Sequence, residues 1–378
     1  MRKVDFVFFD AGGGHRAAAT ALQTVVQQQN RPWEIRMVNL QEVMDPLDIF
    51  RKFTGVRLQD IYNRMLANGW TLGSGYLLPG MHGIIRMYHP AQVKMLSEFW
   101  RSRAPDLVVS VVPNFNRALL QGLRRSPSRA PYVTILTDFA DFPPHFWIER
   151  QDQFLICGTD RAVSQARRMG YPPDRLFRVS GMILRPTFYC ELTHDRNSEL
   201  RKLGLDPNRA TGLVLFGGQG SAHMLRIAEL LQDMHRDVQL ILICGRNEKL
   251  AAELRDMNSH LRMHVVGFTH EVPYYMSLCD FFIGKPGPGS ISEALAMKLP
   301  VIIERNAWTL PQERYNAEWV RRHEVGLVVR SFRKICTAVE QMLEPETFER
   351  LRRNAECVRN RAVFEIPEIL NRIVERHG

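Results

Sequence analysis

The chain has 378 residues, of which 45% are hydrophobic, 24% charged and 9% aromatic, a balance that excludes a disordered or low-complexity protein. This length exceeds one ordinary hydrophobic core and predicts two domains. The formal net charge of +10 indicates an anionic partner, and charge alone leaves open nucleotide phosphate, nucleic acid or an anionic membrane surface.

Several classes of protein are excluded by what the sequence lacks. The six cysteines form no Cys-x-x-Cys pair, so they indicate neither a zinc site nor a disulfide framework, and a reducing cytoplasm is expected. The N-terminal stretch has no cleavage-site pattern, and no apolar run approaches the ~18 residues of a membrane span. No zinc finger or RNA-recognition motif is present, so nucleic acid is not an expected partner.

Short runs of β-branched or aromatic residues alternate with helical patterns along the chain. In the first half the predicted strands lie at residues 4–9, 104–112, 131–139, 153–158 and 176–181. In the second half they lie at residues 212–218, 238–245, 263–268, 279–285 and 299–304. Such alternation predicts parallel sheets covered by helices, and its repetition predicts an α/β protein with two doubly wound domains.

The predicted domain boundaries follow from where this alternation stops. Residues 1–190 form the first predicted domain, and the polar stretch at 191–210 forms a linker without a strand pattern. Residues 211–345 form the second domain, and residues 346–378 form C-terminal helices.

A segment at about residues 41–100 interrupts the first domain. It carries Trp, Tyr, Met and Leu among basic residues and is expected to form inserted helices and loops. Its aromatic residues suit two roles equally, namely packing over the first sheet and facing a lipid surface.

Three glycine-rich loops follow predicted strands and are candidate anion sites. They contain Gly12, Gly13 and Gly14; Gly217, Gly218, Gln219, Gly220 and Ser221; and Gly287, Gly289 and Ser290. At a strand-to-helix turn, free backbone N–H groups and the helix dipole attract phosphate, and glycine lets it approach. None of the loops is a P-loop or a dinucleotide fingerprint, and each could serve only the tight turn itself. Ligands bind at the carboxyl ends of such sheets, which predicts a cleft between two facing domains.

Three acceptor side chains lie near the third loop. Glu293 is one helical turn beyond Ser290, and a carboxylate there can accept two hydrogen bonds from vicinal hydroxyls such as a ribose diol. Its alternative role is a helix-start acid that complements the dipole. Gln312 and Glu313 follow the next strand and offer a neutral and a charged acceptor at the same sheet edge, although loop side chains of this kind are often merely solvated.

His15 directly follows the first glycine loop, in the first turn of the helix expected after it. The helix dipole disfavours an imidazolium there, which keeps the ring neutral and able to accept a proton. His15 is therefore a candidate general base, with capping or packing as the alternative.

The whole chain resembles the glycosyltransferase family that contains monogalactosyldiacylglycerol synthases and bacterial diacylglycerol glucosyltransferases, part of family 28. It is more distantly similar to the enzyme that adds N-acetylglucosamine to lipid I. The resemblance rests on DAGGGHRAAATAL, PYVTILTDF, GYPPDRLFRVSGMILRPTF, FGGQGS, GKPGPGSISEA and PQERYN, in this order along the chain.

The resemblance implies a GT-B fold, in which two facing Rossmann-like domains hold a UDP-sugar and an acceptor. The donor side would use the two C-terminal glycine loops for the diphosphate and Phe268 for uracil. Glu293 would hold the ribose, and Gln312 and Glu313 the sugar hydroxyls. His15 would deprotonate the acceptor hydroxyl beside the first glycine loop. One departure stands out: Pro143 occupies the place where plant enzymes of the family carry a histidine, and His145 follows two residues later on the acceptor side.

The sequence thus predicts an inverting hexosyltransferase that uses no metal or cofactor besides its UDP-sugar donor. The expected acceptor is a lipid, most plausibly diacylglycerol, at the inner face of an anionic membrane to which the protein binds peripherally. The alternatives are transfer of N-acetylglucosamine to a polyprenyl-linked or other acceptor, a UDP-sugar epimerase on the same fold, and a binding protein that has lost catalysis.

Overall fold

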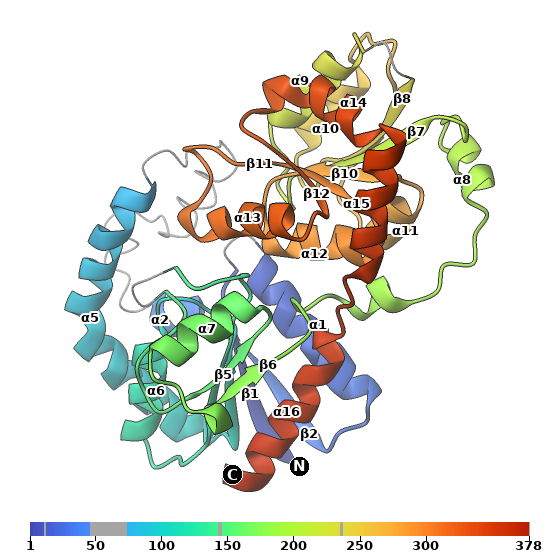
Figure 1. Cartoon of the computed structure of the whole chain (residues 1–378). Coiled ribbons are helices and arrows are strands. Elements are labelled where there is room, and N and C mark those ends of the chain that lie inside the picture. Colours follow the sequence, from blue (N-terminus) through green and yellow to red (C-terminus); the bar gives the residue numbers. More distant parts are fainter. Residues whose placement is uncertain (11–12, 46–73, 143–145, 235–236, 378) are drawn as a thin grey trace. The chain divides into compact units, whose positions relative to one another are not determined.

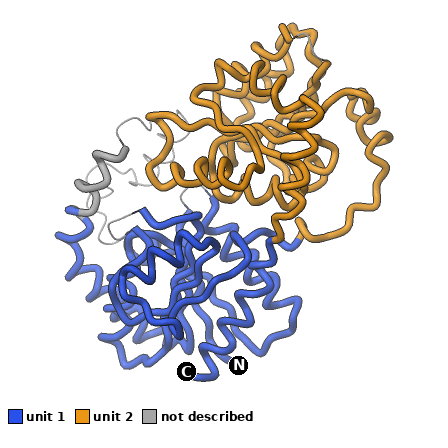
Figure 2. The backbone as a smooth tube through the Cα atoms, viewed as in Figure 1, with its two compact units in different colours: residues 1–64, 73–186, 360–378 blue, residues 65–72, 187–359 orange. Residues whose placement is uncertain are grey.

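A computed structural model describes residues 1–10, 13–45, 74–142, 146–234 and 237–377 of the chain. These residues divide into two compact units, each built around one six-stranded parallel sheet (Figures 1 and 2). The first unit contains the described residues up to 186 together with those from 360 onward, and the second contains those from 187 to 359.

The sheet of the first unit has the strand order β2-β1-β3-β4-β5-β6. Its strands are β1 (Arg2–Phe8), β2 (Trp33–Asn39), β3 (Leu107–Ser110), β4 (Tyr132–Ile135), β5 (Phe154–Cys157) and β6 (Leu176–Arg178). Every pairing is parallel, from Arg2 beside Trp33 at one edge to Cys157 beside Arg178 at the other. From the central strand β1 the chain first adds β2 at one side of β1. It then adds β3, β4, β5 and β6 in turn at the other side, so the strand order reverses between β1 and β3.

Helices cover both faces of this sheet. They are α1 (Gly14–Gln28), α2 (Leu40–Met44), α5 (Ser74–Arg103), α6 (Asn116–Arg125), α7 (Asp160–Arg168) and α16 (Ala362–His377), with the short 3₁₀ turn η2 (Pro173–Arg175). A further 3₁₀ turn, η3 (Pro186–Tyr189), spans the point where the chain passes into the second unit. Right-handed crossovers place α5, α6 and α7 on one face and α1 on the other, where α16 packs against it (Figure 1).

The predicted insert at 41–100 is helical where it is described, and its residues 46–73 lie outside the described part. Trp100, near the end of α5, is fully buried, and its indole N–H donates to the Leu119 carbonyl oxygen at 3.3 Å. Val93, Leu96 and Trp100 share one apolar cluster with α6 and β3. The described end of the insert therefore packs over the first sheet.

The second unit has the strand order β12-β11-β10-β7-β8-β9. Its strands are β7 (Ala210–Leu215), β8 (Val238–Ile243), β9 (Arg262–Val266), β10 (Phe281–Gly284), β11 (Val301–Glu304) and β12 (Gly326–Val329). Here the order reverses between β7 and β10, which pair in parallel from Gly212 beside Phe281 to Leu215 beside Gly284.

The helices of the second unit continue the alternation. They are α8 (Arg196–Lys202), α9 (His223–Leu231), α10 (Glu248–Arg255), α11 (Val272–Ser277), α12 (Pro288–Ala296), α13 (Arg314–Arg322), α14 (Ile335–Met342) and α15 (Pro345–Cys357), with 3₁₀ turns η4 (Pro311–Glu313) and η5 (Phe332–Lys334). One apolar cluster joins α9, α10 and α14 to the sheet, and it includes Leu351 from α15.

The chain returns to the first unit at its end. The Asn360 side-chain amide donates to the Met182 carbonyl oxygen at 2.8 Å, and the Ser180 N–H donates to Glu365 at 2.8 Å. Helix α15 thus packs with the second unit and α16 with the first, a division of residues 346–378 that the sequence patterns do not reveal. The stretch at 191–210 includes the short helix α8 and is grouped with the second unit.

The fold class predicted from sequence is confirmed: both sheets are parallel, doubly wound and covered by helices. All ten predicted strands are present, whereas β2 and β12 were not predicted. Both are edge strands, and several of their side chains are only half-buried. Edge strands are less buried than central ones and carry a weaker apolar pattern, although the other two edge strands, β6 and β9, are among the ten predicted.

A buried carboxylate ties the edge strand β2 and helix α5 to the centre of the first sheet. Asp5 on β1 is inaccessible to solvent, and it accepts hydrogen bonds from Arg36 on β2 at 2.6 Å and from Arg103 on α5 at 3.1 Å. Asp5→Ala leaves two half-buried cations without their partner, which we expect to cost about 3 to 5 kcal/mol. Hydrogen exchange of the β1 amides measures the loss.

The matched control is Asp152→Ala, because Asp152 pairs with Arg175 at 3.1 Å but is 67% exposed. An exposed pair contributes less than about 1 kcal/mol, so this change is expected to leave protection of β1 nearly unaltered. Equal effects of the two substitutions would contradict the structural role given to Asp5.

Candidate active site

The reversal in strand order of the first unit places His15 beside the ends of three strands. The loops after β1 and β3 part at this reversal, which is where open parallel sheets bind ligands. His15 enters from the first turn of α1, after β1, while Val111 follows β3 and Thr137 follows β4. The Thr137 hydroxyl lies 3.3 Å from His15 Nδ1, and the Trp147 ring lies 5.9 Å from the imidazole ring.

The surroundings of His15 keep its ring neutral. Burial lowers the pKa of His15 from 6.5 to about 4, and a hydrogen bond with the Val111 backbone partly opposes this shift. The side chain is closely packed by its neighbours yet retains partial exposure to solvent. The neutral ring expected from sequence is thus reproduced, but desolvation rather than the helix dipole is the principal cause.

The described part of the first glycine loop is open. Gly13 is the N-cap of α1 with a φ of 77°, a conformation that favours glycine. Gly14 has no such requirement, and a Cβ at this position would meet nothing within 4 Å. Gly12, Pro143 and His145 lie outside the described residues.

In the second unit, both predicted phosphate loops stand at the reversal of strand order. The loop at residues 217–221 follows β7, and the loop at residues 285–290 follows β10, the neighbouring strand. The positive φ angles of Gly217 and Gly220, 78° and 61°, form the tight turn that leads into α9. Gln219 at the tip is exposed, and Ser221 is half-buried.

Lys285 joins these two loops, and the sequence analysis did not identify it. If Gly217 carried a side chain, its Cβ would lie 3.8 Å from Lys285 Cε, and a Cβ on Gly287 would lie 3.3 Å from the same atom. Its ammonium group lies 3.4 Å from Glu313 Oε1, and the Glu313 side chain is only 11% exposed. The lysine thus places a positive charge between the predicted phosphate loops. The signal available in the sequence is a lysine two residues before Gly287, at the start of the third glycine loop.

A second contact fixes the same region. Asn316, on the first turn of α13, is fully buried, and its amide donates to the Pro286 carbonyl oxygen at 2.8 Å. This bond and the Lys285–Glu313 pair together hold the β10 loop to the segment that carries Gln312. Glu313 thus pairs with Lys285 beside the phosphate loops, and the binding of sugar hydroxyls expected of it stays a prediction.

The remaining predicted donor residues lie on the same unit. Gly289, Ser290 and Glu293 are in the first turns of α12, and Glu293 is half-buried. Gln312 is half-buried on η4. Phe268, which follows β9, is 49% exposed, and the Arg246 guanidinium stands 5.1 Å from its ring centre.

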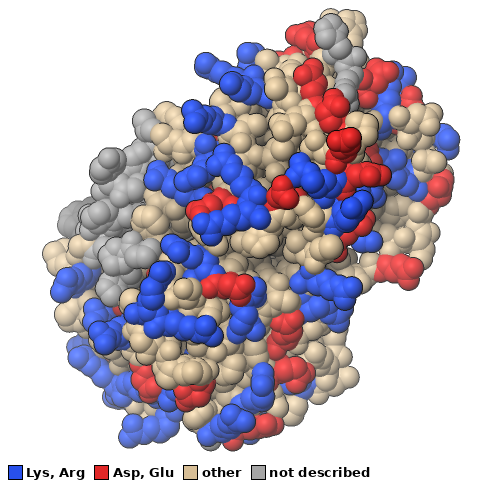
Figure 3. Space-filling view, viewed as in Figure 1, with Lys and Arg blue, Asp and Glu red and all other residues tan. Residues whose placement is uncertain are grey.

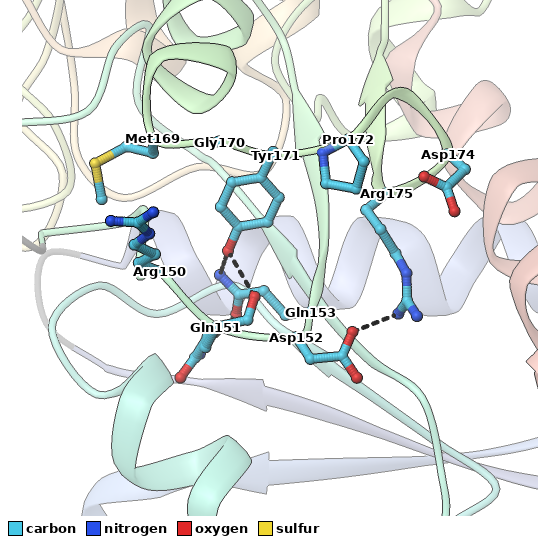
Figure 4. Close-up of a pocket in the computed structure, with 10 residues that line it drawn as sticks. All are labelled: Arg150, Gln151, Asp152, Gln153, Met169, Gly170, Tyr171, Pro172, Asp174 and Arg175. Atoms are coloured by element: carbon cyan, nitrogen blue, oxygen red, sulfur yellow. Dashed lines mark hydrogen bonds and ion pairs between the residues drawn. The ribbon is translucent and has the colours of Figure 1, made fainter.

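A pocket of about 520 Å³ lies at the opposite end of the first sheet, where β5 and β6 begin (Figure 4). Asp152 pairs with Arg175 across it, and the Tyr171 hydroxyl accepts a hydrogen bond from the Gln153 amide at 2.9 Å. These polar groups satisfy one another, and the pocket includes none of the predicted site residues.

The described part of the chain contains neither a membrane-spanning helix nor a cluster of metal-binding side chains. Within it, no helix combines the length and apolar character needed to cross a bilayer. Within the same residues, no three or more His, Cys, Asp and Glu side chains are grouped so that they could hold a metal ion.

Sequence comparison assigns a family to each half of this arrangement. Residues 213–373 match the glycosyltransferase family 28 C-terminal domain, and residues 15–182 match monogalactosyldiacylglycerol (MGDG) synthase. The chain is a member of glycosyltransferase family 28. The first match contains both donor loops, and the second begins at His15.

Relatives of the family 28 chain extend over nearly its full length. The chloroplastic monogalactosyldiacylglycerol synthase of Spinacia oleracea is 26% identical, and the alignment covers 99% of this chain and 73% of the relative. The probable chloroplastic monogalactosyldiacylglycerol synthase of Nicotiana tabacum is 27% identical, and the alignment covers 100% and 72%.

Solved structures share the two-domain GT-B architecture. MurG of Acinetobacter baumannii superposes with a TM-score of 0.64 at 11% identity, covering 98% of this chain and 100% of MurG. Anabaena Alr3699/HepE in complex with UDP-glucose gives a TM-score of 0.54 at 15% identity, with both chains covered completely. A putative UDP-N-acetylglucosamine 2-epimerase of Listeria monocytogenes gives 0.61 at 12% identity, covering 100% and 97%. At these identities the likeness shows the fold alone.

The position of Lys285 predicts a measurable role in UDP affinity. Lys285→Met removes the cation between the phosphate loops, and we expect UDP binding to weaken by about ten- to a hundredfold, as for a lost hydrogen bond to a charged group. Lys285→Arg keeps the charge and is expected to retain most of the affinity. Isothermal titration calorimetry with full-length protein measures both.

A double variant distinguishes two effects of Lys285→Met, namely loss of the lysine charge and loss of the ion-pair partner of Glu313. In Lys285→Met/Glu313→Gln no unpaired carboxylate remains, so the fold is expected to be as stable as wild type while UDP binding stays weak. If this double variant regains wild-type affinity, Lys285 acts only by neutralising Glu313.

Proposed function

We propose that this family 28 chain is an inverting hexosyltransferase that moves a hexose from a UDP-sugar to a hydroxyl of diacylglycerol. The observation that carries the proposal is the pairing of two matches on one chain. A family 28 C-terminal domain contains the donor loops, and an MGDG synthase domain contains His15. The full-length relatives named monogalactosyldiacylglycerol synthase support the same acceptor class.

The proposed reaction is a single displacement at the anomeric carbon. The acceptor hydroxyl oxygen forms a bond to that carbon as the bond to the UDP oxygen breaks, and UDP leaves with the electron pair. The hydroxyl proton passes to His15. A hydroxyl becomes strongly acidic as its oxygen bonds to carbon, so a base with a pKa of about 4 suffices to accept its proton.

Thr137 sets the tautomer that this step needs. For Nε2 to accept a proton, Nδ1 must carry the other one, and the Thr137 hydroxyl lies within hydrogen-bond distance of Nδ1. In this arrangement Nδ1–H donates to Thr137, and Nε2 accepts the proton of the substrate hydroxyl. Thr137 is a positioning residue in this proposal.

The donor side supplies charge complementarity. Negative charge develops on the departing diphosphate, and it is matched by backbone N–H groups of the two glycine loops and by the Lys285 ammonium group. The proposal assigns no step to a metal or cofactor. Glu293 holds the ribose hydroxyls, Gln312 a sugar hydroxyl and Phe268 the uracil ring, with Arg246 on the ring of Phe268.

A basic face on the first unit supports peripheral binding to an anionic membrane, and we propose the cytoplasmic leaflet as its location. Helix α6 has three arginines and no acidic residue, and α7 has three arginines against one aspartate. These arginines are Arg117, Arg124, Arg125, Arg161, Arg167 and Arg168, all exposed. Figure 3 shows Lys and Arg side chains gathered over this part of the molecule. Each basic group near an anionic leaflet contributes about 1 kcal/mol of attraction.

The alternatives differ from the proposal in acceptor or in reaction. An epimerase and a transferase to a polyprenyl-linked acceptor can share the GT-B fold, so the fold does not separate them. The MGDG synthase match over residues 15–182 favours diacylglycerol. Incubation with UDP-glucose, UDP-galactose and UDP-N-acetylglucosamine, each with diacylglycerol or polyprenyl phosphate acceptors, identifies the pair used.

Substitution of His15 tests the proposed base. His15→Gln retains hydrogen bonding without basicity, and we expect sugar transfer to fall by about 10²- to 10⁴-fold, with UDP affinity nearly unchanged. Wild-type transfer is expected to decline only as the pH approaches about 4, because protonation of the ring removes its acceptor. Near wild-type transfer by His15→Gln would assign the imidazole to positioning alone.

The basic face predicts salt-sensitive membrane binding. The protein is expected to bind vesicles that contain anionic lipid, and binding should weaken as salt rises, since exposed charges are screened over about 10 Å at 0.1 M. Replacing Arg117, Arg124 and Arg125 with glutamine should reduce sedimentation with anionic vesicles without altering UDP binding. Equal binding to neutral and anionic vesicles at low salt would contradict the proposal.

A further inference from the structure

His223 contacts the donor loop at a residue already predicted to hold phosphate. His223 is the first residue of α9, directly after the loop at residues 217–221. Its Nδ1 lies 2.9 Å from the Ser221 hydroxyl oxygen, and its backbone N–H donates to the same oxygen at 3.3 Å. Neither the sequence patterns nor the proposed function assigns it a role.

The imidazole ring is held in place by two aromatic side chains. It stacks on Phe216 with ring centres 5.8 Å apart and planes inclined by 10°. The edge of Phe332 approaches it at 6.0 Å, and the Phe332 side chain is buried. Since Phe216 precedes the glycine loop and His223 follows it, these contacts join the two ends of the loop and fix the ring relative to Ser221.

The hydrogen-bond capacity of Ser221 makes the state of His223 decisive. A hydroxyl has one proton to donate and two lone pairs that accept. If Ser221 donates its proton to Nδ1, only lone pairs of the serine oxygen face an approaching phosphate oxygen. The two oxygens then repel each other. If instead Nδ1 carries the proton and donates to Ser221, the serine oxygen accepts from Nδ1–H and from the backbone N–H. Its own proton is then free for the phosphate.

We propose that His223 is a positioning residue of the donor site, which turns the Ser221 hydroxyl proton toward a phosphate oxygen of the nucleoside diphosphate by donating Nδ1–H to the serine. This inference rests on the proposed function, since it requires that the loop bind the diphosphate of the donor. Binding of the diphosphate then selects the histidine tautomer that carries its proton on Nδ1. His223 acts only through Ser221 and needs no contact with the sugar.

Three substitutions separate the hydrogen bond from the ring packing. His223→Phe keeps an aromatic ring against Phe216 and Phe332 but has no N–H to donate. His223→Asn loses the stacking but places an amide N–H close to the position of Nδ1. Ser221→Ala removes the group on which His223 acts.

The measurement is calorimetric titration of the full-length variants with UDP and with uridine. His223→Phe should weaken UDP binding by about tenfold, the effect of losing one hydrogen bond to a charged group, and should leave uridine binding unchanged. His223→Asn should restore UDP affinity to within about threefold of wild type. In the Ser221→Ala background, His223→Phe should cause no further loss.

A spectroscopic readout tests the tautomer directly. In protein labelled with ¹⁵N-histidine, the Nδ1 resonance of His223 is identified as the one missing from the spectrum of His223→Phe. Addition of UDP should shift this resonance into the range of a protonated nitrogen, whereas addition of uridine should not. A purely structural role for the ring predicts no such ligand-specific change.

Several results would overturn the inference. It fails if His223→Phe weakens uridine and UDP equally, if His223→Asn binds UDP as poorly as His223→Phe, or if the losses in His223→Phe and Ser221→Ala add. A wild-type protein that binds UDP no more tightly than uridine would overturn the diphosphate assignment in the proposed function, and this inference with it. Tight UDP binding that is indifferent to every His223 variant would overturn this inference alone.

Discussion

The donor half of the site depends on backbone contact between two neighbouring loops of the second unit. A Cβ on Gly245 would collide with the Gly218 carbonyl oxygen, and a Cβ on Gly220 would lie 2.8 Å from the Cys244 carbonyl oxygen. The Arg246 N–H donates to the Gly218 carbonyl oxygen at 2.9 Å. The loop after β7 can therefore pack directly on the loop after β8 only because glycine occupies these positions.

This contact fixes the donor loop without the help of a ligand. Once Gly218 and Gly220 are held, Ser221 and the start of α9 have defined positions, and Lys285 meets the same turn from β10. A ligand that binds this loop would therefore need to order little of its backbone. No comparable backbone contact holds Gly14, because a Cβ at this position would meet no atom within 4 Å.

The sequence predicts most of the strands because a buried parallel strand requires a nearly continuous run of apolar residues. Ten strands are recognised from apolar runs, including the edge strands β6 and β9, and the two that are not, β2 and β12, lie at the opposite edges of the two sheets. In β2, charged Glu34 and Arg36 break the apolar pattern, and the contact of Arg36 with buried Asp5 explains why a charge occurs there. That contact joins residues distant in sequence and leaves no local pattern.

The site was predictable only in part, for a related reason. Glycine loops carry a local signal, since a turn after a strand demands them, so residues 217–221 and 287–290 were identified. Lys285 and His223 are close in sequence to these loops, but a single lysine or histidine becomes informative about a site only through its neighbours in space. The neutral state of His15 was expected from its place on α1, yet burial by residues from other strands is the main cause.

The return of α16 to the first unit determines when that unit can be completed during synthesis. Its buried face includes Val363, Ile366 and Leu370, and the helix packs against α1. During synthesis on a ribosome, the second unit is therefore complete in sequence before the first, although it starts later in the chain. Domains usually fold as they emerge, from the N-terminus onward. Here the surface of α1 that α16 covers stays exposed until residues 362–377 have been synthesised, which is after the second unit.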